Sequence, residues 1–169
     1  MSIVRVRGAG SLMFVTTMLL AAGPAALSLA AQQPMRITCG NARTNYTASD
    51  GSVWLTDRYF TGGDGGYAKE AIANTSESYL YRTTRYGLYG NFSYNIPAPN
   101  GSYKLTLKFA EWRYWNRGDR VFHVSVNGQR VLSNFDILAE VPSRTALDKE
   151  FWVEVTDGAV RIDFQGVVN

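Results

Sequence analysis

Apolar and polar residues alternate with a period of two along most of the second half of the chain. Residues 103–109 place tyrosine, leucine and phenylalanine at every second position, with lysines and a threonine between them. This is the pattern of a β-strand that has one face in a core. Residues 121–126 repeat the pattern and are followed by Asn127-Gly128. Because both of these residues accept a positive φ, the dipeptide predicts a β-hairpin.

The other apolar runs are short and are separated by turn residues. Residues 151–155 and 160–164 flank a Thr-Asp-Gly sequence at 156–158, which predicts a second hairpin. Only residues 68–73 and 136–140 have the composition of helical turns, and both segments are short. Short strands separated by turns at this spacing predict an all-β fold, an antiparallel β-sandwich of the jelly-roll kind, in a single domain.

The first thirty residues have the pattern of a signal peptide. Arg5 and Arg7 precede an apolar run with no acidic residue near it, and small residues end the segment at Ala30. We therefore expect cleavage after Ala30, export to a secreted, periplasmic or extracellular location, and a mature domain of residues 31–169. An uncleaved membrane anchor is the alternative, but the run is short and Pro24 interrupts it. We expect no membrane span in the mature chain.

The near balance of charge and the single cysteine and histidine argue against several functions. The chain has 17 basic and 14 acidic side chains, and two of the arginines lie in the expected signal peptide, so the mature domain is nearly neutral. Nucleic acid is therefore not an expected partner. Cys39 and His123 are the only cysteine and the only histidine. A single cysteine excludes an internal disulfide. One cysteine and one histidine also argue against a Cys/His metal site or a histidine-activated nucleophile. We expect no cofactor and no metal, and a solvated strand position for His123.

Aromatic residues and glycines are abundant, with 10 Tyr, 8 Phe, 4 Trp and 16 Gly. Many of them lie between residues 53 and 87, in the long connection before the first clear alternating strand. Sugar rings present apolar C–H faces and hydroxyl edges, so aromatic platforms beside polar side chains are typical of carbohydrate sites.

The same stretch opens a series of motifs that resembles the malectin domain, in order and with compatible spacing over residues 36–169. The motifs are Val53-Trp54, Tyr59-Phe60, Gly62-Gly63, Leu80-Tyr81, Thr84-Arg85-Tyr86-Gly87, Asn100-Gly101, Leu107-Lys108-Phe109-Ala110-Glu111, Asn134-Phe135-Asp136-Ile137 and Ile162-Asp163-Phe164-Gln165-Gly166. The resemblance implies a β-sandwich that binds oligosaccharide or polysaccharide without catalysis, and hence no catalytic residues.

The resemblance also implies ligand-binding positions. Tyr67 matches the ligand-facing tyrosine after the glycine-rich loop, and Tyr86 matches a second one. Asn169 matches an acidic ligand residue of the family. An amide still accepts and donates hydrogen bonds, but it does not make the stronger bond of a carboxylate.

An aromatic pair in the family follows the Phe-Ala-Glu motif. At equal spacing it falls on Arg113 and Tyr114, so Tyr114 transfers and Arg113 does not. Trp115 replaces the missing ring if the chain bulges by one residue there. These departures imply a sugar different from the ligand of animal malectin.

Chains of this family usually continue past the Val-Val-Asn at 167–169 with one more apolar strand. The resemblance therefore implies a C-terminally truncated domain with an open sheet edge, or a strand that another chain supplies.

Two alternative functions remain open at this stage. A glycoside hydrolase needs two carboxylates facing one bond, and the candidates are Glu111, Asp119, Asp136 and Asp163. The competing interpretation gives these acids a scaffold role, for example an ion pair with Arg85.

The second alternative is a protein-interaction module at a cell surface. Arg113, Arg117 and Arg120 beside an aromatic surface would suit a protein partner. The competing interpretation is a solvated arginine-rich loop with turn composition.

Overall fold

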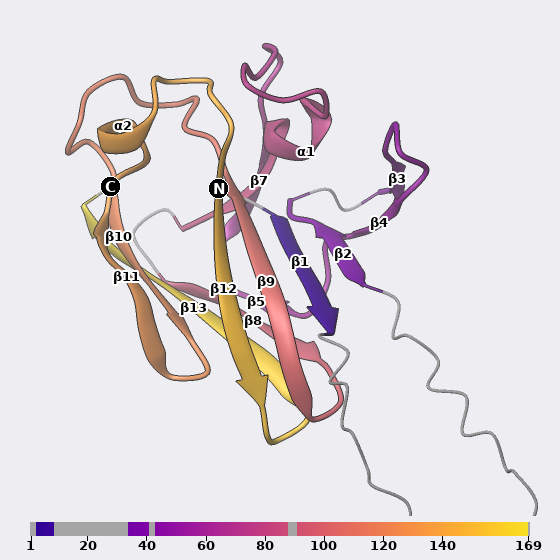
Figure 1. Cartoon of the computed structure of the whole chain (residues 1–169). Coiled ribbons are helices and arrows are strands. Elements are labelled where there is room, and N and C mark those ends of the chain that lie inside the picture. Colours follow the sequence, from indigo (N-terminus) through magenta and orange to yellow (C-terminus); the bar gives the residue numbers. More distant parts are fainter. Residues whose placement is uncertain (1–2, 9–33, 41–42, 88–90, 169) are drawn as a thin grey trace, which may run out of the picture.

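The computed structural model describes residues 3–8, 34–40, 43–87 and 91–168. Two large sheets face each other, with β9 and β12 in one layer and β10, β11 and β13 in the other (Figure 1). The six-stranded sheet has the order β12-β9-β1-β2-β4-β3, the five-stranded sheet has the order β11-β10-β13-β8-β5, and β6 and β7 form a separate ribbon. The predicted all-β sandwich is confirmed.

Most strand pairs are antiparallel, and β2 and β4 are a parallel pair. The elements are β1 (Ile3–Gly8), β2 (Met35–Thr38), β3 (Tyr46–Thr47), β4 (Val53–Thr56), β5 (Phe60–Thr61), β6 (Asp64–Tyr67), α1 (Tyr79–Arg82), β7 (Thr83–Tyr86), β8 (Phe92–Pro97), β9 (Gly101–Phe109), β10 (Val121–Val126), β11 (Gln129–Phe135), α2 (Ile137–Glu140), β12 (Leu147–Val155) and β13 (Ala159–Val168).

The main core lies between the two large sheets. Leu105, Leu107 and Phe109 of β9 are no more than 1% exposed, as their alternation predicts. They pack in one cluster with Val124 of β10 and Ile162 of β13. Burying such side chains contributes roughly 1.5–3 kcal/mol each, so this cluster is the main source of stability for the sandwich.

Of the two predicted hairpins, one is confirmed and one is wrong. β10 and β11 pair through the Asn127-Gly128 turn, where both residues have positive φ. β12 does not pair with β13: it pairs with β9 in one sheet, while β13 pairs with β10 and β8 in the other. The Thr-Asp-Gly connection therefore crosses between sheets, where the Gly158 N–H donates to Asn100 Oδ1. Alternation shows which residues face the core but carries no information on the partner strand.

Of the two predicted helical segments, one is confirmed and one is wrong. α2 begins at Asp136, whose carboxylate accepts a hydrogen bond from the Leu138 N–H as an N-cap. Residues 68–73 are not helical, because distant carbonyls bind their backbone: the Ala68 N–H donates to Arg82 O and the Ala73 N–H to Arg144 O. The other short helix is α1, which begins six residues after Ala73, at Tyr79.

The expected signal peptide contains β1. Residues 3–8 pair with β9 on one side and with β2 on the other, antiparallel to both. β1 therefore lies inside the six-stranded sheet and not at its edge. The rest of the expected signal peptide and its cleavage point lie outside the described residues, so cleavage and export stay predictions. Within the part of the chain that the structure describes, no helix is long and apolar enough to cross a membrane.

The position of β1 can be tested by cross-linking in the full chain, produced without export. Arg5 is the register partner of Thr106 on β9, so we expect Arg5→Cys with Thr106→Cys to form a disulfide on mild oxidation, because directly opposed residues lie within bridging distance. Cys39 should not interfere, because burial, and then the charge of Asp57, raises the pKa of its thiol to about 12. Peptide mapping by mass spectrometry detects the cross-link.

The control pairs Arg5→Cys with Lys108→Cys, two residues out of register, where the separation is too large for efficient bridging. Equal cross-linking of both pairs, or of neither, would contradict the assignment of β1 to this sheet.

Candidate functional site

The β6–β7 ribbon carries two of the predicted ligand-binding tyrosines. Its register pairs Asp64 with Tyr86 and Tyr67 with Thr83. The glycines of β6 allow close approach: a Cβ on Gly66 would lie 3.0 Å from Cε1 of Tyr86 and 3.3 Å from Cζ2 of Trp112. Glycine at this position therefore lets the Tyr86 and Trp112 rings lie against the ribbon backbone.

A shallow hollow opens beside these two rings. Its lining consists of Thr84, Tyr86, Trp112, Arg113 and Arg120, and its volume is about 10 Å³. That volume holds one water molecule. A larger ligand would therefore lie across the mouth of the hollow and would not be enclosed by it.

A buried ion pair fixes the ribbon on the sandwich. The Asp57 side chain is 1% exposed and that of Arg85 is 8% exposed, with Nη2 of Arg85 2.8 Å from Oδ2 of Asp57. Nε of Arg85 also donates to Oδ2, and the Tyr94 hydroxyl donates to Oδ1 at 2.9 Å. Burial raises the pKa of this hydroxyl far above its ordinary value, so it stays a donor. Every charged oxygen of Asp57 thus has a partner, as a buried carboxylate requires.

The other side of the Arg85 guanidinium holds the loop before β6. Its Nη1 donates to the carbonyl oxygens of Gly62 and Gly63 at 3.0 and 2.8 Å. Its carbon lies 3.4 Å from the centroid of the Phe60 ring. One arginine therefore joins β7, the carboxylate of Asp57 and the glycine loop.

Glu111 organises the second loop of the site in the same way. Its side chain is 2% exposed and pairs with Nη1 of Arg120 at 2.8 Å. Its other oxygen accepts from the backbone N–H groups of Arg113 and Tyr114 at 2.8 and 3.2 Å. Three residues that line or adjoin the hollow therefore take their positions from one carboxylate.

The predicted site residues divide between this hollow and its surroundings. Tyr86 lines it, and Tyr114 lies next to it, with its ring centroid 4.7 Å from the guanidinium of Arg120. Trp115 is 62% exposed, and the guanidinium of Arg144 lies 4.9 Å from its ring. Neither Trp115 nor Tyr67 is part of the lining.

Tyr67 faces a different set of neighbours. It is 51% exposed, its ring lies 6.4 Å from that of Tyr79, and the Arg82 guanidinium lies 4.7 Å above it. On a pleated ribbon, positions 66 and 67 project to opposite faces, which separates Tyr67 from the side of Tyr86. Asn169 lies outside the described residues.

Sequence reasoning missed Trp112. It follows the Phe-Ala-Glu motif directly, one position before the expected aromatic pair, and the equal-spacing argument passed over it. Of Arg113 and Trp115, only Arg113 lines the hollow. The ring beside Tyr86 is that of Trp112.

The four carboxylates considered for hydrolysis have other partners or positions. Glu111 is in its ion pair, and Asp136 caps α2 and accepts from the Gly118 N–H at 2.7 Å. Asp119 accepts from the backbone N–H of Asn116 at 3.2 Å. Asp163 is exposed on β13. The scaffold interpretation is confirmed for Glu111, although its partner is Arg120 and not Arg85.

Two other side chains of interest also bind the scaffold. Nε of Arg117 donates to the carbonyl oxygen of Leu138 at 3.1 Å. His123 is half-buried rather than solvated, and its Nδ1 accepts from the Asn134 N–H at 2.9 Å. Among the residues that the structure describes, no three His, Cys, Asp or Glu side chains are grouped as metal ligands.

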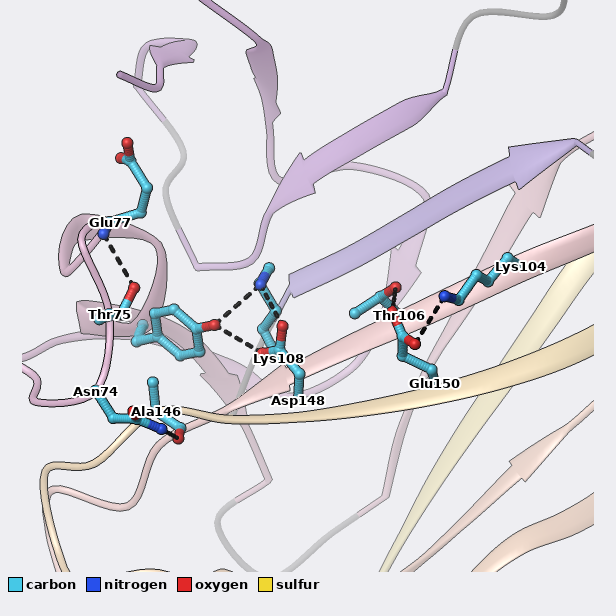
Figure 2. A network of polar contacts seen from close by, with 10 residues as sticks. Asn74, Thr75, Glu77, Lys104, Thr106, Lys108, Ala146, Asp148 and Glu150 are labelled. Carbon is cyan, nitrogen blue, oxygen red and sulfur yellow. Dashed lines mark hydrogen bonds and ion pairs between the residues drawn. The ribbon is translucent and has the colours of Figure 1, made fainter. Parts of the chain in front are cut away.

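A wider hollow of about 270 Å³ lies between the β3–β4 hairpin, α1 and β9. Figure 2 shows the polar contacts at its edge, where Nζ of Lys108 donates to the Tyr81 hydroxyl at 2.9 Å and to Asp148 at 2.6 Å. Burial, and then the hydrogen bond to Asp148, raise the pKa of Tyr81. Trp54 in its lining is only 3% exposed, so it offers no ring face to a sugar.

Removing the Glu111 carboxylate tests its role in the loop. We expect Glu111→Ala to lower the free energy of unfolding by about 3–5 kcal/mol, because Arg120 loses its buried partner and two backbone donors lose their acceptor. Urea unfolding followed by tryptophan fluorescence measures this change. The control Asp163→Ala removes an exposed acid and should change stability by no more than about 0.5 kcal/mol. Similar values for both variants would show that Glu111 does not have this role.

Comparison with known proteins identifies the family. The profile of the Malectin domain matches residues 34–169. Malectin-A of Xenopus laevis is 36% identical over 98 residues, which are 57% of this chain and 34% of that protein. Human Malectin is 34% identical over 98 residues, which are 57% of this chain and 32% of that protein. The matched part of the chain thus corresponds to about a third of the length of these relatives.

Solved structures agree on the fold. A β-glucuronidase of Bacteroides uniformis superposes with a TM-score of 0.68 at 22% identity, over 80% of this chain and 16% of that enzyme. The extracellular domain of ANXUR1 from Arabidopsis thaliana superposes with a TM-score of 0.66 at 19% identity, over 78% of this chain and 42% of that one. At these identities the likeness concerns the fold alone. The family profile covers most of the chain, and we conclude that this protein belongs to the malectin domain family.

Proposed function

We propose that this protein is a non-catalytic carbohydrate-binding module whose site is centred on Tyr86 and Trp112. The observation that carries this proposal is the shallow hollow, where two aromatic rings lie beside two guanidinium groups and a threonine. This combination supplies apolar platforms for the C–H face of a sugar and donors for its hydroxyl groups. Membership of the malectin domain family supports the same class of ligand.

The shape of the hollow favours binding without enclosure. A volume of about 10 Å³ is too small for a sugar ring, so a glycan would lie across the rings as an extended ligand. Tyr114 and the exposed Trp115 extend the aromatic surface along the loop after β9. Tyr67 projects from the opposite face of the ribbon and stays a proposed ligand contact from the sequence resemblance. Asn169 stays a proposed hydroxyl partner from the sequence resemblance.

The carboxylate geometry favours binding over hydrolysis. Glu111 directly precedes Trp112 in the sequence, and its ion pair with Arg120 and two backbone hydrogen bonds occupy both of its oxygens. A general acid must hold a proton and reach the glycosidic oxygen. The β-glucuronidase likeness covers only 16% of that enzyme and does not carry its activity to this chain.

Glycan binding by ring variants tests the proposal. We expect Tyr86→Ala and Trp112→Ala each to weaken binding by about 1–3 kcal/mol, or roughly 5- to 150-fold, because each removes a stacking surface. A glycan array screen of the full chain identifies a binding sugar, and calorimetry gives its affinity. Chromatography of the bound glycan after one day reports breakdown products.

Trp152→Ala is the matched control, because Trp152 is 69% exposed on β12 and is not part of the hollow. We expect this variant to bind as the unmodified protein does. Equal affinities for all three variants would place the site elsewhere, and glycan breakdown would overturn the non-catalytic assignment.

A further inference from the structure

Arginine side chains lie against three of the aromatic rings predicted to bind a ligand. Guanidinium carbons lie 4.7 Å from the ring centroids of Tyr67 and Tyr114 and 4.9 Å from that of Trp115. The residues that supply them are Arg82, Arg120 and Arg144. A fourth, Arg113, lines the hollow with Tyr86. The loop after β9 and the hollow thus combine aromatic rings with positive charges, whereas Tyr67 and Arg82 lie on the opposite face of the ribbon.

Two of these positive charges have carboxylate partners and two do not. Arg120 pairs with Glu111 at 2.8 Å, and Arg144 pairs with the exposed Glu70 at 3.4 Å. Arg82 donates to the carbonyl oxygens of Ala68 and Lys69, which leave its charge uncompensated. No ion pair to Arg82 or Arg113 occurs within the described ranges, 3–8, 34–40, 43–87 and 91–168.

Arg113 is placed for use by a ligand. Its backbone N–H is held by Glu111 at 2.8 Å, while its side chain is exposed at the hollow. A fixed backbone with a free guanidinium costs less ordering on binding than a mobile loop does. The planar guanidinium matches a carboxylate through two parallel hydrogen bonds, which a neutral hydroxyl group cannot reproduce.

We propose that the ligand is an acidic glycan whose uronic acid carboxylate binds Arg113 while its sugar ring lies on Tyr86 and Trp112. This inference rests on the proposed function and adds the chemical class of the sugar. Asp64 on the ribbon opposes the anion, because it is exposed and is the register partner of Tyr86. Arg82 lies over Tyr67, on the face of the ribbon opposite to Tyr86, and takes no part in this contact.

The experiment compares matched acidic and neutral sugars on the folded full chain. The probes are trigalacturonate and triglucuronate, each with its carboxyl-reduced form, and a sulfated derivative of each reduced form. We expect calorimetry at low salt to show at least tenfold tighter binding of one acidic trisaccharide than of its reduced form. This preference should fall as salt concentration rises, because screening weakens exposed charge pairs.

Charge variants then assign the preference to residues. Arg113→Gln should weaken binding of the acidic form by a much larger factor than binding of the reduced form, so that most of the acidic preference is lost. Asp64→Asn should raise the affinity for the acidic form alone. Arg130→Gln is the control, because Arg130 is exposed on β11 and is not part of the hollow. Circular dichroism melting confirms that each variant is folded.

Each outcome decides between the inference and the proposed function. Tighter binding of the acidic form that Arg113→Gln abolishes supports the inference. Equal binding of acidic and reduced forms, a preference unchanged by Arg113→Gln, or equal binding of sulfated and carboxylated forms overturns it and leaves the carbohydrate-binding function intact. A folded protein that binds none of these sugars and no glycan on the array overturns the proposed function itself.

Discussion

The buried ion pair between Asp57 and Arg85 is the interaction on which the ribbon and the candidate site depend. A carboxylate that is 1% exposed is stable only when each oxygen has a donor. Asp57 receives donors from three separate places in the chain: the Gly40 N–H, the Arg85 guanidinium and the Tyr94 hydroxyl. The pair therefore ties the end of β2, the ribbon and β8 together. Loss of either charge would leave the other buried without an opposite charge.

A second carboxylate applies the same principle to the loop after β9. Glu111 combines an ion pair with two backbone hydrogen bonds, so the loop takes its shape from one side chain. Asp57 thus positions the ribbon and Glu111 positions the loop, each through its own set of partners. In both cases a buried carboxylate positions the groups around it. The rings of Tyr86 and Trp112 and the side chain of Arg113 then line the hollow. A binding surface built this way needs little rearrangement when a ligand arrives.

Two departures from the family pattern both make the charge of the chain more positive. Arg113 stands where the resemblance expects an aromatic ring, and Trp112 supplies the ring beside Tyr86 instead. Asn169 stands where it expects an acid. One change adds a positive charge and the other removes a negative one. The charge at these two sequence positions thus differs from the family pattern while the sandwich stays the same, as expected when variation is concentrated in loops on a shared scaffold.

The sequence alone determined the class of fold, the family, the buried face of β9, the β10–β11 hairpin and the Asp136 cap, because alternation, turn residues and caps act over a few neighbouring positions. It also pointed to Tyr86, which lines the hollow, and to Tyr114, which lies next to Arg120 of the lining. Only the tertiary structure decided which strands pair, so β12 and β13 joined different sheets. Trp112, the separation of Tyr67 from Tyr86 and the partners of Asp57 and Glu111 likewise depend on contacts between distant segments. Such contacts follow from packing and the satisfaction of buried charge, which no local pattern records.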